Sequence, residues 1–466
     1  MAKVPKNGVF LFYVPMKLQR ISELQHTFSF LSSTEQLAAY RERFFESDLG
    51  KIYQAIPWDE LVREFGSKPC GKGPGFMFSP RGRIALMVLK HHAGCSDRKL
   101  IEQLNSNIDY QFFCDIHLGL QRITNYKIVS QIRCELSRVL EIDALEKVFY
   151  THWKPYIDEA EKAVVDATCY ESEVRYPTNQ KLLWEAVEWL YKALRRLCRA
   201  LKVKLPRSKY LKWKKRYIGY SKMRKKTIKK RRSLTRALLR LLEKFLSFEK
   251  QLLKVHSVEL PKRYYKTMYT IRKVYRQQWN LFTTGEKPKG RIVSIGKDYL
   301  RPIVRGKEIK KVEFGAKVNK LQIDGINFIE LISFDNFNEG TRLKSSVYKA
   351  QGLTRRRLKV LGADAIYATN ANRRFVTRHG IKTDFKPKGP KGKHRKQQAQ
   401  LKGQITKERA SRLEGSFGKE KEHYHLKKIK AKTRATEILW IFFGIHTANC
   451  LEIGRRMTGQ LHQQAA

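Results

Sequence analysis

Acidic residues are in short supply in this sequence. It has 43 Asp and Glu residues against 96 Lys and Arg, so its 466 residues carry a formal net charge of +53 at pH 7. A surface this basic repels itself unless a polyanion neutralises it. The phosphates of a nucleic acid do so with release of condensed counterions. The charge balance therefore predicts a nucleic-acid-binding protein.

Long apolar runs are also missing. None approaches the roughly 18–20 residues that a membrane-spanning helix needs, and the longest candidate, Leu439–Ile445, belongs to an amphipathic pattern. The N-terminal run Val9–Met16 lacks a full signal-peptide core and a small-residue cleavage site. We therefore expect no membrane partner and a cytoplasmic location.

The seven cysteines are scattered, and no pair has CxxC spacing. This argues against a zinc site or a disulfide framework and predicts free thiols. The sequence also lacks the aromatic strand typical of RNA-recognition domains and has no internal repeat. With 42% hydrophobic residues the chain can bury a sizeable core, and its length allows two or three domains.

Residues 1–150 have a mainly helical pattern. Arg83–His92 and Asp97–Leu104 carry apolar residues at helical spacing, and a short break containing Gly94 separates them. Ser96 can cap the second helix. The pair is compatible with a DNA-reading helix-turn-helix, while packing or dimerisation is the alternative.

A strand and a long basic helical stretch follow. Ala163–Thr168 is a short apolar run that predicts a buried strand, and Asn179–Gln278 has helical spacing. Lys or Arg occupy 16 of the 31 positions from 202 to 232, with no acid among them. A solvated helix face is one interpretation, but uncompensated like charges destabilise a helix. We predict DNA-backbone contacts here, from Lys214, Lys215, Arg216, Arg224, Lys225 and Lys226. The interleaved aromatics can stack on bases or pack against neighbouring helices.

From residue 291 the β pattern returns. The expected strands are Val312–Val318, Phe328–Asp335 and Val360–Tyr367, and Asp324-Gly325 is a typical hairpin turn between the first two. A loop rich in Pro, Gly and Lys covers residues 386–396. Helical spacing resumes after residue 405, with a break predicted at residues 415–418 and a frayed tail from residue 455.

Few acids are placed where they could serve chemistry on DNA. Phosphodiester transfer needs an activated attacking oxygen and a neutralised leaving oxygen, which two divalent metals provide. Magnesium prefers carboxylate oxygens. Asp166 ends one apolar strand and Asp364 lies within another, where an ionised carboxylate is costly unless paired or metal-bound. Asp335 and Glu339 form a second acidic pair, which we interpret as turn residues.

Four sequence blocks, in this order, resemble the DDE transposases of bacterial insertion sequences. The first is Val165–Thr168 with Arg175–Asn179 after it, and the second comprises Arg301–Ile303, Gly306-Lys307 and Val312–Lys317. The third is Ala363–Tyr367, in which an Asp precedes a Tyr by three, with Asn372 and Arg373 following. The fourth is Arg412–Gly418, in which a Glu is followed after six further residues by Lys421.

The resemblance implies a fold and a site. The fold is an α/β, ribonuclease-H-like core with a mixed five-stranded sheet and flanking helices, formed by residues 160–180 and 290–454. Residues 1–150 are an N-terminal helical domain for DNA binding or dimerisation, and residues 181–285 are a helical basic insertion after the first core strand. Asp166, Asp364 and Glu414 are the catalytic metal ligands, for Mg²⁺ with Mn²⁺ as a substitute.

The resemblance also implies partners and an activity. The protein cleaves transposon ends and joins their 3′-hydroxyls to target DNA, acting on double-stranded DNA as a nucleoid-associated homodimer. Lys421 contacts DNA near the cleaved end. Two alternatives are a DNA-binding protein without catalysis, such as a degenerate transposase, and an RNA-processing nuclease on a similar core.

The sequence departs from the family around the glutamate. Many relatives have a Tyr and an Arg seven and four residues before it, where this chain has Lys407 and Ala410. Arg409 and Arg412 are close by. A register shift would promote another acid in place of Glu414, and the nearby candidates are Glu408, Glu420 and Glu422.

Overall fold

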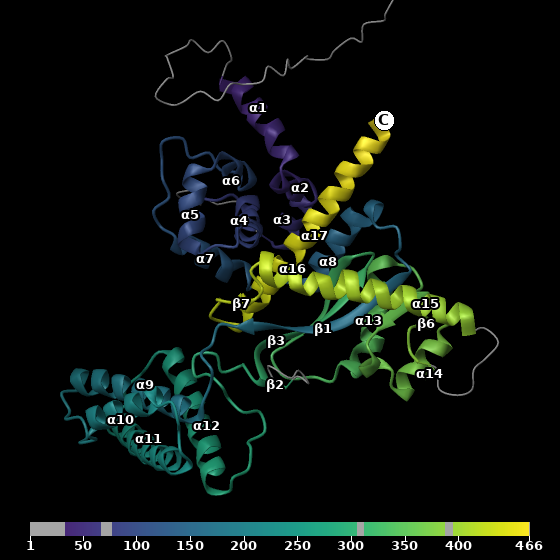
Figure 1. Ribbon diagram of the computed structural model, residues 1–466. Coiled ribbons are helices and arrows are strands. Elements are labelled where there is room, and N and C mark those ends of the chain that lie inside the picture. The colour runs from purple at the N-terminus through teal and green to yellow at the C-terminus, as the bar shows by residue number, and fades with distance from the viewer. Residues whose placement is uncertain (1–32, 67–76, 305–311, 387–394, 466) are drawn as a thin grey trace, which may run out of the picture.

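The computed structural model describes residues 33–66, 77–304, 312–386 and 395–465. Figure 1 shows three groups of elements: N-terminal helices, a central sheet with its covering helices, and four helices inserted between the first two strands. The run Val9–Met16, the block Gly306-Lys307 and most of the predicted loop at 386–396 lie outside the described residues.

Within the described residues, eight α-helices precede the sheet, as the helical pattern of this region predicted. They are α1 (Ser33–Glu46), α2 (Asp48–Gln54), α3 (Trp58–Glu64), α4 (Pro80–Ala93), α5 (Asp97–Ser106), α6 (Ile108–Phe113), α7 (Lys127–Leu136) and α8 (Ile142–Trp153). The α4–α5 hairpin is confirmed: Gly94 has a positive φ of 58°, and the Ser96 side chain accepts a hydrogen bond from the Lys99 amide. Almost all of α4 from Ile84 onward is buried, so this helix is a core element.

Within the described residues, seven strands form one mixed sheet. They are β1 (Lys162–Ser172), β2 (Pro302–Val304), β3 (Val312–Ile323), β4 (Ile326–Ser333), β5 (Val360–Ala363), β6 (Lys382–Thr383) and β7 (Lys428–Ile429). The central strand β1 is antiparallel to β3 and parallel to β5. The order is β4–β3–β1–β5–β6, while β2 pairs with the start of β3 and β7 with the end of β1. The predicted α/β class with a mixed sheet is confirmed, but the described residues form seven strands where five were expected.

Two local signals explain how the strands end. Asp324 and Gly325 both have positive φ, 45° and 79°, as the turn of a tight hairpin requires, so the predicted turn between β3 and β4 is confirmed. The predicted strand Val360–Tyr367 is only half right. It ends at Ala363, because the Asp364 side chain accepts a hydrogen bond from the Ala365 amide and begins a 3₁₀ turn.

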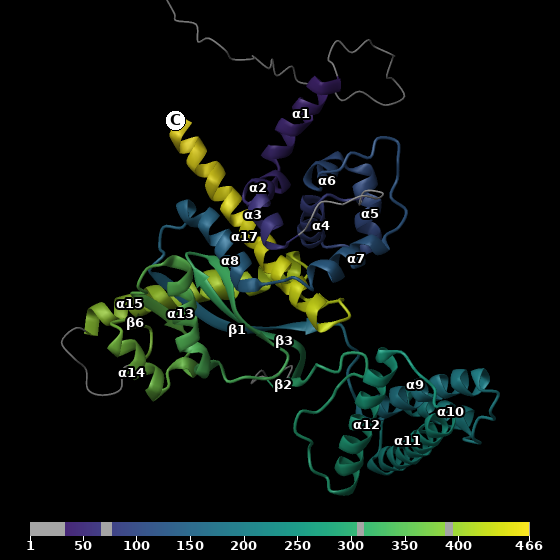
Figure 2. The ribbon, with the colours of Figure 1, turned by 180° about the vertical axis from the view of Figure 1, so that it is seen from behind.

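Helices cover both faces of the sheet. They are η3 (Glu339–Arg342), α13 (Leu343–Thr354), η4 (Ala365–Tyr367), α14 (Asn370–Arg378), α15 (Arg395–Glu408), η5 (Arg409–Glu414), α16 (Gly415–His423) and α17 (Arg434–Ala465). Side chains alternate along a strand, so Thr168 and Tyr170 on one face contact α16, while Asn319 on the opposite face contacts α13. Figures 1 and 2 show α15, η5 and α16 running across the sheet as one rod.

Two C-terminal predictions are wrong. No break occurs at residues 415–418, since η5 and α16 run on through both glycines. The tail from residue 455 is not frayed but continues α17. This last helix crosses α2 so closely that a Cβ at Gly454 would lie 2.4 Å from the Lys51 carbonyl oxygen. Tertiary packing, which the sequence pattern does not report, holds it in place.

The inserted helices have a hydrophobic core of their own, which includes Leu190, Leu238 and Phe245. They are α9 (Asn179–Ala200), α10 (Tyr210–Lys222), α11 (Ile228–His256) and α12 (Lys262–Thr283). In Figure 1 these teal helices project from one end of the sheet. The chain turns between them through Lys202, Lys209 and Ser257, all with positive φ.

Candidate active site

Asp166 and Asp364 are neighbours in space although 198 positions separate them in the sequence. β1 and β5 run parallel, and Val165 on β1 pairs with Ala363 on β5. The residue that follows each member of this pair is one of the two aspartates. The geometry therefore brings together two of the three carboxylates that the sequence singled out, at the point where β5 ends.

Asp166 is in an environment that disfavours its negative charge. Its pKa is raised to about 6, chiefly by burial and also by the nearby carboxylates of Glu339 and Asp364, against the lowering effects of the Ala167 amide and Arg409. The amide donates to Asp166 Oδ1 at 2.7 Å. A carboxyl group held in this way gains from any cation that comes to share it.

Asp364 is better solvated, with 55% of its side chain exposed. It accepts a hydrogen bond from the Ala365 amide at 2.6 Å and forms an ion pair with Arg409, whose Nη1 lies 3.3 Å from Oδ1. The guanidinium is mostly buried, and its Nε has no hydrogen-bond partner in the described part of the chain. Arg409 thus has a spare donor beside the two aspartates.

Glu414 lies at the end of η5, which packs against β1. Its side chain is exposed. Among the described residues, no three or more His, Cys, Asp or Glu side chains gather closely enough to form a metal site. The structure thus joins Asp166 to Asp364 and leaves Glu414 outside a closed three-carboxylate cluster.

A π-helical turn explains how the chain departs from the family pattern. η5 is π-helical, and a π turn links residues five apart where an α turn links residues four apart. Arg409, five residues before Glu414, therefore stands one turn away from it. In relatives the arginine stands four residues before the glutamate, at the position of Ala410, whereas Arg409 stands five residues before it. The wider π turn compensates for this difference of one position.

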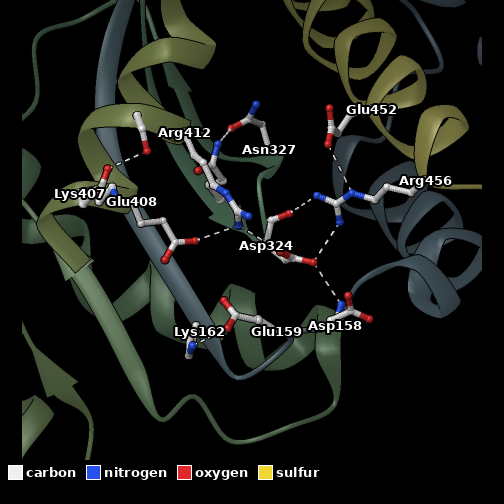
Figure 3. A network of polar contacts seen from close by, with 12 residues as sticks. Asp158, Glu159, Lys162, Asp324, Asn327, Lys407, Glu408, Arg412, Glu452 and Arg456 are labelled. Atoms are coloured by element: carbon white, nitrogen blue, oxygen red, sulfur yellow. Dashed lines mark hydrogen bonds and ion pairs between the residues drawn. The ribbon is translucent and has the colours of Figure 1, made fainter. Parts of the chain in front are cut away.

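Arg412, the other nearby arginine, is directed elsewhere. Figure 3 shows its guanidinium contacting Asp324 at the β3–β4 turn, at 3.2 Å, and Glu408 at 3.3 Å. Asp324 also binds Arg456 of α17 at 2.9 Å. Arg412 therefore fastens η5 to the hairpin and, through Asp324, to α17. Of the two arginines, Arg409 is the one that reaches the aspartates.

The substitute glutamates have other partners. Glu408 pairs with Arg412, and Glu422 pairs with Lys427 on the surface at 2.8 Å. Glu420 is fully buried and pairs with Lys320 at 2.6 Å, and the Tyr170 hydroxyl donates to it. Structural roles thus account for all three.

The buried Lys320–Glu420 pair was not anticipated from the sequence. Lys320 is cross-strand partner to Asp166 and so shares its face of the sheet. Burial lowers the pKa of Lys320, against the raising effect of Glu420. Lys421, the next residue of α16, donates to the Thr168 hydroxyl at 3.0 Å, two positions from Asp166 on the same face. The pair therefore fixes α16, the helix that carries Lys421, onto β3, next to β1.

Glu339 has a larger part than the turn interpretation gave it. It lies near enough to Asp166 to raise its pKa, and it pairs with Lys317 at 2.8 Å with only 14% of its side chain exposed. Asp335, by contrast, is 79% exposed and contacts Arg301 at 3.8 Å. The two acids look alike in the sequence, and only the position of Glu339 near Asp166 in the folded chain distinguishes it from Asp335.

Two family comparisons match this chain. Residues 37–135 match the family described as a transposase domain (DUF772), and residues 361–445 match the family described as a transposase DDE domain. The second segment contains Asp364, Glu414 and Lys421. Both matches support a DDE transposase of insertion-sequence type. Neither a curated protein nor a solved structure is significantly similar to it.

A transposase acts on DNA, so these matches imply DNA as the partner. Across its described residues, none of the helices has the length and apolar character needed to cross a bilayer. The six described cysteines are free thiols.

The basic residues singled out in the transposase sequence are all exposed. Lys214, Lys215 and Arg216 lie on α10, and residues 224–226 form the loop that follows. The interleaved aromatics pack inward: Tyr210 stacks on Tyr191 with ring centroids 3.7 Å apart. Their role in holding α10 against α9 leaves the cations on the outer surface.

Proposed function

We propose that this transposase cleaves transposon-end DNA and joins the freed 3′-hydroxyl to target DNA at a site built from Asp166, Asp364 and Glu414. The observation that carries the proposal is the adjacency of Asp166 and Asp364 on parallel strands. An arginine and a lysine, which suit a phosphate, lie close to them. The mechanism is direct phosphoryl transfer, which needs no protein nucleophile.

The donor set fits Mg²⁺, or Mn²⁺ in its place. Carboxylate oxygens are the ligands that these hard cations prefer, and DDE transposases generally use divalent metal. The raised pKa of Asp166 signals an unbalanced negative charge that a cation would relieve. When bound, the metal pair activates the attacking oxygen and neutralises the leaving oxygen.

The protein's own residues position the reactants. Asp166 on β1 and Asp364 directly after β5 would hold the metal, and we assign the third carboxylate to Glu414 on the rod that packs against β1. Arg409 orients Asp364 through their ion pair and adds positive charge beside the site. Lys421, fixed against Thr168, contacts DNA near the cleaved end. Positioning and charge neutralisation supply most of the rate.

We further propose a ribonuclease-H-like core, formed by residues 160–180 and 290–454. The strand order β4–β3–β1–β5–β6, with β3 antiparallel to its neighbours, supports this. Residues 1–150 and 181–285 are proposed as separate DNA-binding regions, the latter through the cations on α10 and its loop. Joining two ends requires two active sites, so we propose a homodimer in the DNA complex.

The test is cleavage of a duplex carrying the inverted repeat that borders the coding region. Asp166→Asn and Glu414→Gln should each abolish Mg²⁺-dependent nicking while duplex affinity stays within about twofold. Glu422→Gln, an exposed glutamate of the same rod, is the matched control and should cleave normally. Cleavage at the wild-type rate by either site variant would remove that residue from the mechanism.

A further inference from the structure

A large cleft lies away from the two aspartates, where three parts of the chain meet. Its volume is about 1720 Å³, and its walls come from α5 and α7, from α9 and α12, and from the segment after β7. Figure 1 shows α7 and β7 on one side and α9 and α12 on the other. Small-molecule pockets occupy about 300–1,000 Å³, so this space suits a polymer better than a metabolite. We call it the three-part cleft.

Exposed cations without acidic partners line this cleft. Lys127 comes from α7, Arg196 from α9, Arg263 from α12, and Lys430 and Lys432 from the segment after β7. Within the described residues, none of the five forms an ion pair. Each of the three walls therefore contributes at least one uncompensated positive charge to the same space.

The three acids that line the cleft do not cancel this surplus. Glu185 pairs with Lys181 and Asp298 pairs with Lys266. Lys90 and Arg133 share one acid, Asp97, at 2.9 Å and 3.0 Å. Arg133 also lies over the Trp440 ring, 4.7 Å from its centroid. Two cations on one carboxylate leave a net positive charge at the base, on a surface held rigid by the tryptophan.

Aromatic side chains add an apolar wall. Trp189 packs against Tyr264 with ring centroids 5.4 Å apart, and both line the cleft. Cations at the rim with apolar surface below match a sugar–phosphate backbone, whose phosphates are charged and whose sugars are largely apolar. The same arrangement lacks the clustered carboxylates that a metal ion needs.

The position of the cleft relative to the aspartates defines what it can hold. Ser172 pairs with Ile429, next to the cleft residue Lys430, and lies six positions along β1 from Asp166. At about 3.3 Å per residue this is about 20 Å. A DNA strand advances about 3.4 Å per nucleotide, so the separation corresponds to about six base pairs.

We propose that the three-part cleft binds the backbone of the transposon-end duplex about six base pairs inside the cleaved bond. This rests on the proposed function, which places the cleaved bond at Asp166. Because all three walls contribute charge, the duplex joins the N-terminal helices and the inserted helices to the sheet. The cleft thus positions the end for cleavage.

The test compares two five-site variants of the full chain by binding to the end duplex between 50 and 200 mM salt. The cleft variant replaces Lys127, Arg196, Arg263, Lys430 and Lys432 with Gln. The control variant makes the same change at five exposed cations outside the cleft, Arg138, Lys147, Lys154, Arg378 and Lys382. Both lose the same charge, so a general electrostatic effect moves them equally.

The cleft variant should bind at least tenfold more weakly than the control at 100 mM salt. The slope of log K against log salt should be shallower for the cleft variant by up to about 4.5, since each lost phosphate contact reduces the slope by about 0.9. Phosphate ethylation about six base pairs inside the cleaved bond should interfere with binding by the wild type and not by the cleft variant. Circular dichroism and thermal unfolding establish that both variants fold.

Equal binding by the two variants, or interference confined to the cleaved bond, would overturn the inference. Selective loss of RNA-duplex binding, with DNA binding unchanged, would overturn it too. The proposed function fails separately, if the wild-type protein binds the end but never nicks it with Mg²⁺ or Mn²⁺.

Discussion

Replacing Asp166 with Asn should make the metal-free protein more stable, although it should destroy the active site. The pKa of Asp166 is raised from 3.8 to about 6, chiefly by burial. At about 1.4 kcal/mol for each tenfold change, this corresponds to about 3 kcal/mol against the ionised form at neutral pH. Asn has nearly the same shape, carries no charge, and its Oδ1 can still accept from the Ala167 amide.

The assay is unfolding followed by circular dichroism in EDTA at pH 8. If the sheet and its helices unfold as one unit of about 200 residues, 3 kcal/mol raises the midpoint by about 6–12 °C. Asp364→Asn is the control. Because Asp364 is largely exposed and attracted to Arg409, its neutralisation should give no such rise.

The pH dependence has a definite sign. A carboxyl group whose folded-state pKa is raised binds a proton in the folded protein before the unfolded chain does. Wild-type stability should therefore increase as the pH falls from about 6 towards 3.8, and the advantage of Asp166→Asn should shrink over that range. Mg²⁺ at pH 8 should raise the midpoint of the wild type and not of the variant.

Two results would refute this reasoning. One is a midpoint for Asp166→Asn that equals or falls below the wild-type value at pH 8 in EDTA. The other is a difference between the two proteins that stays constant from pH 8 to pH 5. Either would mean that burial does not penalise the Asp166 charge.

Two further predictions concern the rod that crosses the sheet. Lys320→Met should cost about 3–5 kcal/mol of unfolding free energy because it leaves Glu420 buried without its partner, and adding Glu420→Leu should recover part of that loss in a double-mutant cycle. Arg409→Ala should lower the cleavage rate at least tenfold with little change in the unfolding midpoint. Arg412→Ala should instead lower the unfolding midpoint and keep more of the cleavage rate. Equal cleavage rates for the two variants would contradict the assignment of Arg409.

Much of the fold could be predicted because its signals are local. The apolar run at β1, the Asp324-Gly325 turn and the Ser96 cap each depend on a few adjacent residues. The approach of Asp166 to Asp364 did not follow from any local pattern. It came from the resemblance to a family, since the pairing of β1 with β5 depends on chain segments that are distant in the sequence.

Other features of the site could not be predicted from the sequence because they arise only in the folded chain. The π turn of η5 has no sequence signature, so the choice between Arg409 and Arg412 stayed open until the helix could be seen against β5 and the hairpin. The sequence singled out Glu420 only as a possible substitute for Glu414 and did not single out Lys320, although both are completely buried. In so basic a chain, a buried lysine cannot be told from its many exposed counterparts by composition.

The placement of α17 has a consequence for how the protein becomes competent during synthesis. Asp166 on β1 leaves the ribosome early, but Asp364 follows it about 200 residues later and Glu414 about 250 residues later, and α17 reaches back to pack against α2, α4 and α7 only after them. At about 5–20 residues per second, that interval lasts tens of seconds. A chain interrupted after α12 would keep the cations of α9 to α12 and lack two of the three proposed ligands. Such a fragment could not cut DNA at the proposed site, because Asp364 and Glu414 would be absent.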